Sequence, residues 1–245
     1  MRTTFSALVA ALAMVMSIIV VPSAGASTLD SQLERLVELQ MIPADVNRTE
    51  LGKQLARAAA KEGVSETALL ATMIRDGEKS LAASGIRPTA ACENDDRIIL
   101  GYADRKGDLF ISPAWTSIAN HGHTGIYYST TVVVEAPGSS SNSRSISGQR
   151  VKVCPGAERM KVETSAYKRR SAANFAYNRY RGKPYDIWWG VNKTNGSGEL
   201  NCSELVWRAY KHSRANIDLD DNDGGTSIIP YMIKWDRATT VYESV

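Results

Sequence analysis

The hydrophobic pattern of this chain changes its period once, near residues 87–96, and this change limits the folds that the chain can adopt. Before it, apolar residues recur at helical spacing, as Leu29 and Leu33 do. After it, short runs rich in β-branched and aromatic residues predict strands. The sequence therefore predicts an α+β fold, in which a helical region at 27–90 precedes a second domain at 97–245.

The helical region is expected to hold three helices. Leu51 and Leu55 lie on the apolar stripe of the second helix, which Gly63 ends. Ser65 is a suitable N-cap for a third helix that ends near Gly85. The region holds no set of residues that points to chemistry. Three interpretations stay open: a small domain, a layer that packs on the second domain, and a pro-segment.

The N-terminus has the features of a secretory signal peptide at 1–26. Arg2 supplies the positive charge, residues 5–21 form an uncharged apolar run, and Ala24-Gly25-Ala26 matches the small-residue cleavage pattern. We expect cleavage after Ala26 and a secreted protein. The alternative is an uncleaved membrane anchor, because the apolar run nearly reaches bilayer-spanning length. No other stretch has that length, so stable membrane insertion is not expected after cleavage.

The second domain is expected to combine short strands with two helices. Strands are expected at 98–100, 109–112, 125–128, 131–134 and 151–153, a Ser/Gly-rich loop at 137–147, a basic helix at 165–181, and one or two strands in 228–245. The second helix follows residue 201, and its apolar stripe contains Leu205 and Val206.

The overall charge and the metal-binding side chains exclude several classes of function. A net charge of +3 is too small to indicate nucleic-acid binding, so no nucleic-acid partner is expected. The cysteines lack paired spacing, and the neighbouring His121 and His123 have no evident third ligand. We therefore expect neither a metal nor another cofactor.

The chain has three cysteines, Cys92, Cys154 and Cys202. An odd number in a secreted protein suggests one disulfide and one free thiol, and pairing of Cys92 with Cys154 leaves Cys202 free. The alternative is that all three are buried thiols.

Cys202 is the strongest candidate for a catalytic residue. It follows the loop-type residues 194–198 and begins the expected helix. Unpaired N–H groups and the positive end of the helix dipole favour a thiolate there, and the thiolate is the nucleophilic form of cysteine.

A cysteine nucleophile needs a base and a group that orients this base. His123 precedes an expected strand, and Glu135 ends the next one. A hairpin between these strands brings the two residues to the same end, where Nδ1–H of His123 is expected to donate to Glu135. His212 lies too far along the Cys202 helix to serve as the base. A lone histidine near a strand start or a lone glutamate at a strand end is more often a solvated surface group. The prediction therefore depends on the joint presence of Cys202, His123 and Glu135.

Several motifs occur in an order that resembles the circularly permuted NlpC-type, papain-like cysteine hydrolases of the YiiX-like group. The resemblance covers about residue 107 to the C-terminus, and its motifs are Lys106-Gly107-Asp108-Leu109, Gly122-His123-Thr124-Gly125-Ile126-Tyr127, Val134-Glu135-Ala136, Gly182-Lys183-Pro184-Tyr185-Asp186 and Asn201-Cys202-Ser203-Glu204-Leu205-Val206. The resemblance implies a permuted papain-like core in which the cysteine helix packs on a mostly antiparallel sheet. It implies Cys202 as the nucleophile, His123 as the general base and then acid, and Glu135 as the orienting residue.

Other residues near these motifs are candidates for binding the substrate. Tyr185 or Asn201 could supply a second donor to the oxyanion. Trp188 and Trp189 either form a wall that stacks on sugars or pack in the core.

These features predict a secreted cysteine hydrolase that works through a thioester. Secretion and the resemblance favour amide bonds of cell-wall peptides as its substrate. One alternative keeps the chemistry and makes it an acyl hydrolase or transferase that acts on lipids or lipid-modified amides. The other is a non-catalytic module that binds the cell wall or another partner.

Overall fold

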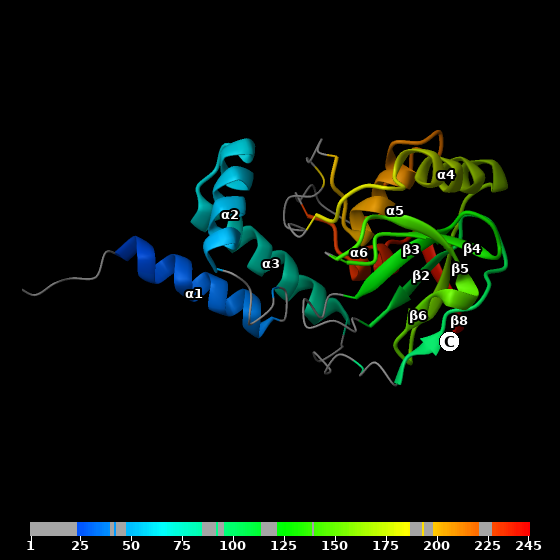
Figure 1. Cartoon of the computed structure of the whole chain (residues 1–245), viewed down its shortest axis with the longest axis horizontal. Coiled ribbons are helices and arrows are strands. Elements are labelled where there is room, and N and C mark those ends of the chain that lie inside the picture. The colour runs from blue at the N-terminus through cyan, green and yellow to red at the C-terminus, as the bar shows by residue number, and fades with distance from the viewer. Residues whose placement is uncertain are drawn as a thin grey trace, which may run out of the picture.

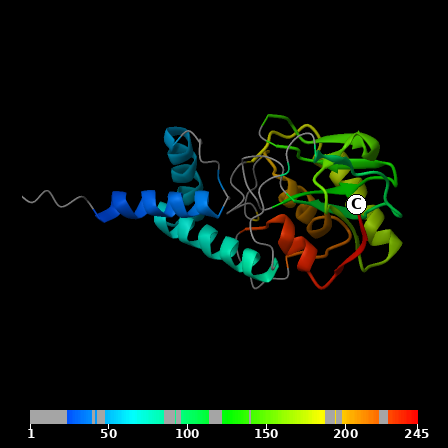
Figure 2. The ribbon, with the colours of Figure 1, turned by 90° about the horizontal axis from the view of Figure 1, so that it is seen from below.

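A computed structural model describes most of the chain after its first 23 residues. The described residues are 24–39, 42, 48–84, 92, 96–113, 122–138, 140–186, 193, 198–220 and 227–245. Most of the expected signal peptide, together with His121, Trp188 and Trp189, lies outside them. Helices α1 to α3 form one unit, and it lies beside an α+β unit that contains the sheet (Figures 1 and 2).

The helical unit consists of the three expected helices. They are α1 (Ala24–Glu38), α2 (Arg48–Glu62) and α3 (Glu66–Ser84). Ser65 caps α3, because its Oγ accepts a hydrogen bond from the Ala68 N–H at 3.1 Å. The three helices share a core of their own, in which Leu36, Leu55, Leu70 and Met73 are buried.

The α+β unit is built on a six-stranded antiparallel sheet with the order β5-β4-β3-β2-β7-β8. Its strands are β2 (Leu109–Ser112), β3 (His123–Tyr127), β4 (Val132–Glu135), β5 (Arg144–Ser147), β7 (Glu158–Val162) and β8 (Thr239–Ser244). A separate pair joins β1 (Ile98–Ile99) to β6 (Lys152–Val153), and a short 3-10 helix, η2 (Gly148–Arg150), precedes β6. Helices and an antiparallel sheet confirm the predicted α+β class.

Alternate residues of the strands enter two different cores, as the pleat of a sheet requires. Leu109, Ile126 and Val134 pack in one cluster with Leu205 and Val206. This cluster lies under α4 (Ala166–Arg179), α5 (Cys202–Lys211) and α6 (Pro230–Trp235), which cover one face of the sheet (Figure 1).

The other face of the sheet has a smaller core. Phe110, Tyr127 and Val133 pack there against Leu100 and Val153, beside the β1–β6 pair. The sheet is therefore buried on both faces near its centre, where β2, β3 and β4 lie side by side.

Two expectations for this unit were wrong. The expected loop at 137–147 ends in strand β5, because Arg144–Ser147 pairs along its whole length with β4. The expected strands of the tail begin instead with α6, since Pro230 at the first turn of this helix favours a helical start. Only the last part of the tail, β8, is a strand.

The segment 227–229 joins the two units. Ile228 lies in the core under α5, whereas the next residue, Ile229, lies in the core of the helical unit. Ser227 Oγ hydrogen-bonds to the carboxylate of Asp76 on α3. Successive side chains of an extended segment point to opposite sides, so this short piece of chain contributes to both cores.

The structure places Cys92 and Cys154 in a disulfide, with 5.7 Å between their Cα atoms. Cys202 is the free cysteine, and it is buried. Within the described residues, no helix combines the length and the apolarity that crossing a membrane requires.

Candidate active site

Cys202 is the first residue of α5, as the sequence predicted, and its side chain is buried. Asn201 is the N-cap: its Oδ1 accepts hydrogen bonds from the Glu204 N–H at 2.9 Å and from Ser203 Oγ at 3.0 Å. A helix leaves the N–H groups of its first turn without internal partners, and these groups favour negative charge. The cap therefore fixes the cysteine beside these N–H groups. Asn201, expected as a donor to the substrate, uses its carbonyl oxygen for the cap.

His123 and Glu135 meet at one end of the β3–β4 hairpin. The register pairs Gly125 with Glu135, so that His123 is a diagonal neighbour of Glu135 on the same face. His123 Nε2 lies 3.0 Å from Glu135 Oε2, and both side chains are buried. The expected contact through Nδ1 is thus wrong, since the ring is turned so that Nε2 faces the carboxylate. The pairing register predicts that the residues meet, but not this rotation.

The imidazole of His123 also forms a hydrogen bond with the side chain of Cys202. Because Nε2 faces Glu135, Nδ1 is the ring nitrogen left for the sulfur. Burial by itself lowers the pKa of His123, but the hydrogen bonds with Cys202 and Glu135 outweigh this effect and raise the pKa to about 9. At neutral pH the ring is therefore an imidazolium.

Arg144, on the edge strand β5, holds the other oxygen of Glu135. Its Nε and Nη2 donate to Glu135 Oε1 at 2.9 and 2.8 Å. Burial tends to raise the pKa of Glu135, but His123 and then Arg144 overcome this effect and hold the pKa below its usual range. Arg144 could not be recognised from the sequence, because its contact with Glu135 depends on the pairing of β4 with β5 at 135 and 144.

Phe110 is a second neighbour of His123 that the sequence did not reveal. Its ring meets the imidazole edge-on, with 5.3 Å between the ring centroids. Gly125 makes room for this ring, because a Cβ at position 125 would lie 2.6 Å from Phe110 Cε1. An absent side chain in β3 thus allows the packing that holds the histidine ring.

Tyr185 is a second partner of Cys202. Its hydroxyl hydrogen-bonds with the Cys202 side chain. Burial, followed by the nearby charges of Cys202 and Asp186, raises the pKa of Tyr185 well above its usual range. The phenol therefore stays protonated and can donate a hydrogen bond close to the sulfur.

Glu204 is a fully buried acid in the first turn of α5. Arg208 Nε donates to its Oε1 at 2.6 Å, whereas Oε2 is buried and accepts no hydrogen bond from the described residues. Burial raises the pKa of Glu204 to about 8; Arg208 offsets part of this rise, and Asp186 adds to it. At neutral pH this carboxyl is mostly protonated.

The structure thus brings together Cys202, His123, Glu135 and Tyr185 from a helix N-terminus, a hairpin and a loop. This arrangement can hold a proton on an imidazole beside a sulfur and place hydrogen-bond donors next to that sulfur. The described part of the chain holds no group of three or more His, Cys, Asp or Glu side chains that could hold a metal ion.

Comparison with known proteins gives two similarities, and no protein-family model matches the chain. The chain is 30% identical over 141 residues to the uncharacterized protein YycO of Bacillus subtilis (strain 168). The aligned part is 57% of this chain and 56% of YycO, so the chain spans little more than half the length of this relative.

Among solved structures, the chain is similar to the metalloprotein YiiX of Escherichia coli O157:H7, a DUF1105 protein. The TM-score is 0.38 and the identity 16%, over 58% of this chain and 97% of YiiX. Neither comparison shows the permuted NlpC-type assignment.

Proposed function

We propose that this protein is a cysteine hydrolase of the permuted NlpC-type, papain-like kind, with Cys202 as nucleophile, His123 as base and acid, and Glu135 as the orienting residue. One observation carries the proposal: the buried ring of His123 hydrogen-bonds both to Glu135 and to Cys202. A nucleophile, a base in contact with it and a group that orients the base are the three parts that acyl transfer through cysteine requires.

In the proposed reaction, Cys202 and His123 react as a thiolate–imidazolium pair. The sulfur attacks the carbonyl carbon of an amide and forms a C–S bond. His123 gives its proton to the departing amine as the C–N bond breaks, which leaves a thioester. Water then loses a proton to His123 and attacks the thioester, releasing the acid and returning the proton to the pair.

Two donors are available for the oxyanion that forms in each step. The backbone N–H of Cys202 belongs to the first turn of α5, where no internal hydrogen bond uses it. The hydroxyl of Tyr185 already lies against the sulfur and remains protonated. We assign Tyr185 as the second donor, because its hydroxyl hydrogen-bonds with the Cys202 side chain.

The proposed substrate is an amide bond in cell-wall peptides, and the proposed location is outside the cell. The signal-like segment at 1–26 supports secretion. The disulfide between Cys92 and Cys154 supports it too, because disulfides persist in oxidising compartments.

The reactivity of the thiol tests the proposed pair. We expect iodoacetamide to alkylate Cys202 rapidly near neutral pH and much more slowly in His123→Ala. Glu135→Gln, which keeps the shape of the side chain, should give an intermediate rate. A wild-type thiol that reacts no faster than cysteine in a free peptide would refute the catalytic assignment.

The products test the substrate. Purified protein is incubated with peptidoglycan fragments and, separately, with a panel of lipid esters and lipid amides, and the products are identified by mass spectrometry. Cys202→Ser is the inactive control. Tyr185→Phe should lower the turnover by about 10²–10³. It should slow alkylation much less, because alkylation loses only the hydrogen bond to the sulfur and forms no oxyanion. Release of acyl groups only from lipids would replace the cell-wall substrate.

A further inference from the structure

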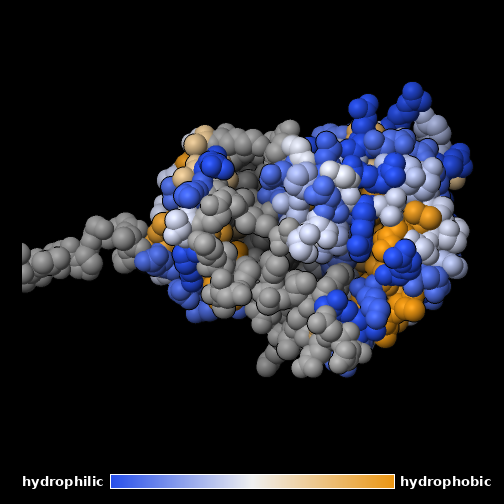
Figure 3. Space-filling model, viewed as in Figure 1, coloured by the Kyte–Doolittle hydropathy of each residue, from blue (hydrophilic) through white to orange (hydrophobic). Residues whose placement is uncertain are grey.

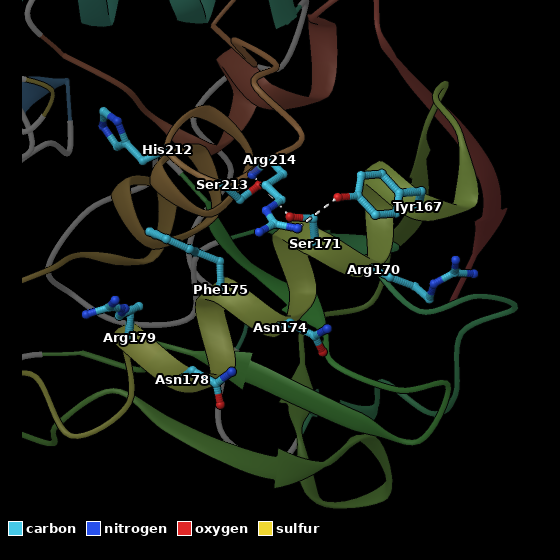
Figure 4. Close-up of a pocket in the computed structure, with 10 residues that line it drawn as sticks. All are labelled: Tyr167, Arg170, Ser171, Asn174, Phe175, Asn178, Arg179, His212, Ser213 and Arg214. Atoms are coloured by element: carbon cyan, nitrogen blue, oxygen red, sulfur yellow. Dashed lines mark hydrogen bonds between the residues drawn. The ribbon is translucent and has the colours of Figure 1, made fainter.

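A basic groove runs along the outer side of α4, and the proposed reaction makes no use of it. Its volume is about 600 Å³, which is within the range of small-molecule binding sites. One wall is a stripe of α4, and the other is the segment His212-Ser213-Arg214, which follows α5 (Figure 4). The surface over α4 is hydrophilic (Figure 3).

The sequence of α4 separates this groove from the core. The lining residues recur every three or four positions, at 167, 170 and 171, 174 and 175, and 178 and 179. This is the spacing of one helix face. The buried residues Ala172, Ala173 and Ala176 lie on the opposite face, against the sheet. The exposed half of this helix, opposite the three alanines, therefore carries its basic side chains.

Three arginines line the groove: Arg170, Arg179 and Arg214. None of them forms an ion pair with a carboxylate of the described residues, and no Asp or Glu is among the lining residues. Arg214 Nη1 instead donates to the hydroxyl of Tyr167 at 3.3 Å, a neutral acceptor.

The surroundings of the three arginines are neutral donors and an aromatic side chain. Asn174 and Asn178 lie between Arg170 and Arg179 along α4, and Phe175 forms part of the floor. His212 lies at the other wall, where burial and the charges of Arg208 and Lys211 lower its pKa. Asp218, which opposes this effect, is tied to Lys211 by an ion pair.

The arginines are spread along the groove and are not gathered at one point. Arg170 and Arg179 are nine residues apart in α4, which is roughly 13 Å along the axis of a helix and about two and a half turns, so they lie at opposite edges of its exposed half. Figure 4 shows them at opposite ends, with Arg214 between them. A single small anion can contact only one part of such a row, whereas a chain of anionic groups can contact all of it.

We propose that this groove binds a linear ligand that carries phosphate groups at intervals, held by Arg170, Arg214 and Arg179. Guanidinium groups bind phosphate oxygens through two parallel hydrogen bonds, and Asn174 and Asn178 offer neutral donors between them. Polymers of sugar or polyol phosphates and polyphosphate share this chemistry. The modest net charge of the whole chain favours such a short local contact over nucleic-acid binding.

Titration calorimetry on the full chain tests the proposal with four probes: inorganic phosphate, short linear polyphosphate, poly(glycerol phosphate) and a single-stranded oligonucleotide. The groove variant is Arg170→Gln/Arg179→Gln/Arg214→Gln. The matched control is Arg57→Gln/Arg75→Gln/Arg237→Gln, which removes the same charge from exposed arginines on α2, on α3 and after α6.

We expect at least one of the two phosphate polymers to bind more tightly than inorganic phosphate, and the two polymer arms identify which backbone is preferred. The groove variant should bind the polymer at least about tenfold more weakly than the wild type. The slope of log K against log salt concentration should become shallower by roughly one unit per arginine removed. The control variant should bind like the wild type. Cys202→Ser should also bind normally, so this test is independent of the proposed hydrolysis.

Three outcomes would overturn the proposal. The first is no binding of either polymer at low salt, and the second is equal loss in the groove and control variants. The third is a preference for the oligonucleotide over both polymers, which would indicate a nucleic-acid site. Circular dichroism of each variant checks that the fold is retained.

Discussion

Two acidic side chains, Glu135 and Cys202, are hydrogen-bond partners of the buried His123 ring. Glu135 is kept ionised by His123 and Arg144, and its carboxylate faces Nε2 of the ring. The Cys202 side chain is the other partner. A buried imidazole would otherwise lose its proton, because burial disfavours the charged form. The two acidic partners therefore decide the protonation of this residue, and changes at either should be visible in its titration.

We predict that the ring of His123 titrates at about 9, so that the imidazolium is present below this pH and lost above it. Glu135→Gln and Cys202→Ser should each move the midpoint down toward 6.5, the usual value, because each removes a partner that raises the pKa of His123. NMR of histidine-labelled protein measures the midpoint, with His212 as an internal reference. A midpoint below 6.5 in the wild type would contradict the proposed pair. Amide hydrolysis should decline as the pH rises through about 9.

Arg144 gives a second prediction at this scale. Arg144→Gln leaves Glu135 without its cation, which raises the pKa of the Glu135 carboxyl and allows it to take up a proton at higher pH. The acidic limb of the alkylation rate of Cys202 should then move to higher pH. Arg144→Lys, which keeps the charge, should restore most of the wild-type profile. If Arg144 only supported the fold, Arg144→Gln would lower the melting temperature and leave the acidic limb of the alkylation rate where it is.

At the scale of elements, the start of α5 fixes the position of the nucleophile. Asn201→Ala removes the acceptor for the Glu204 N–H and should reduce the free energy of unfolding by about 1 kcal/mol. Asn201→Asp keeps the acceptor, so its stability should stay near the wild-type value. Its added negative charge disfavours a thiolate at Cys202, and alkylation should slow. Urea unfolding measures the stability of each variant, and the alkylation rate measures the reactivity of Cys202. Slow alkylation in Asn201→Ala but not in Asn201→Asp would contradict the predicted charge effect.

Elements with a strong apolar period could be predicted from the sequence, and those without one could not. The stripes of α1, α2 and α5 are regular, and these helices form where they were expected. Strand β5 was missed because Ile146 is its only apolar residue, and its pairing with β4 depends on backbone hydrogen bonds.

The residues of the candidate site likewise fall into those that the sequence could predict and those that it could not. Residue types and their order along the chain indicated Cys202, His123 and Glu135. The contacts of Arg144 and Phe110 depend on strand register and on a missing Cβ at Gly125, and no local pattern encodes either.

At the scale of the whole molecule, two hydrophobic cores meet at one short segment near the candidate site. Ile228 is buried under α5 and Ile229 among α1 to α3. The carbonyl of Ile228 accepts a hydrogen bond from Ser203 Oγ at 2.6 Å, and Ser203 follows Cys202 directly. The helical unit is thus connected to the start of α5 through three consecutive residues, which also include Ser227 and its bond to Asp76.

Because Ile228 and Ile229 lie in different cores, we predict that α1 to α3 can unfold while the sheet stays folded. Ile229→Ala should cost roughly 2–5 kcal/mol, chiefly in the core of α1 to α3. Ile228→Ala makes the same chemical change one residue earlier and is the matched control, because it weakens the core under α5. Hydrogen exchange should show faster exchange in α1 to α3 for Ile229→Ala, and in α5 and the sheet for Ile228→Ala. The same exchange pattern in both variants would mean that the two cores unfold together, because a cooperative unit opens as a whole wherever it is weakened.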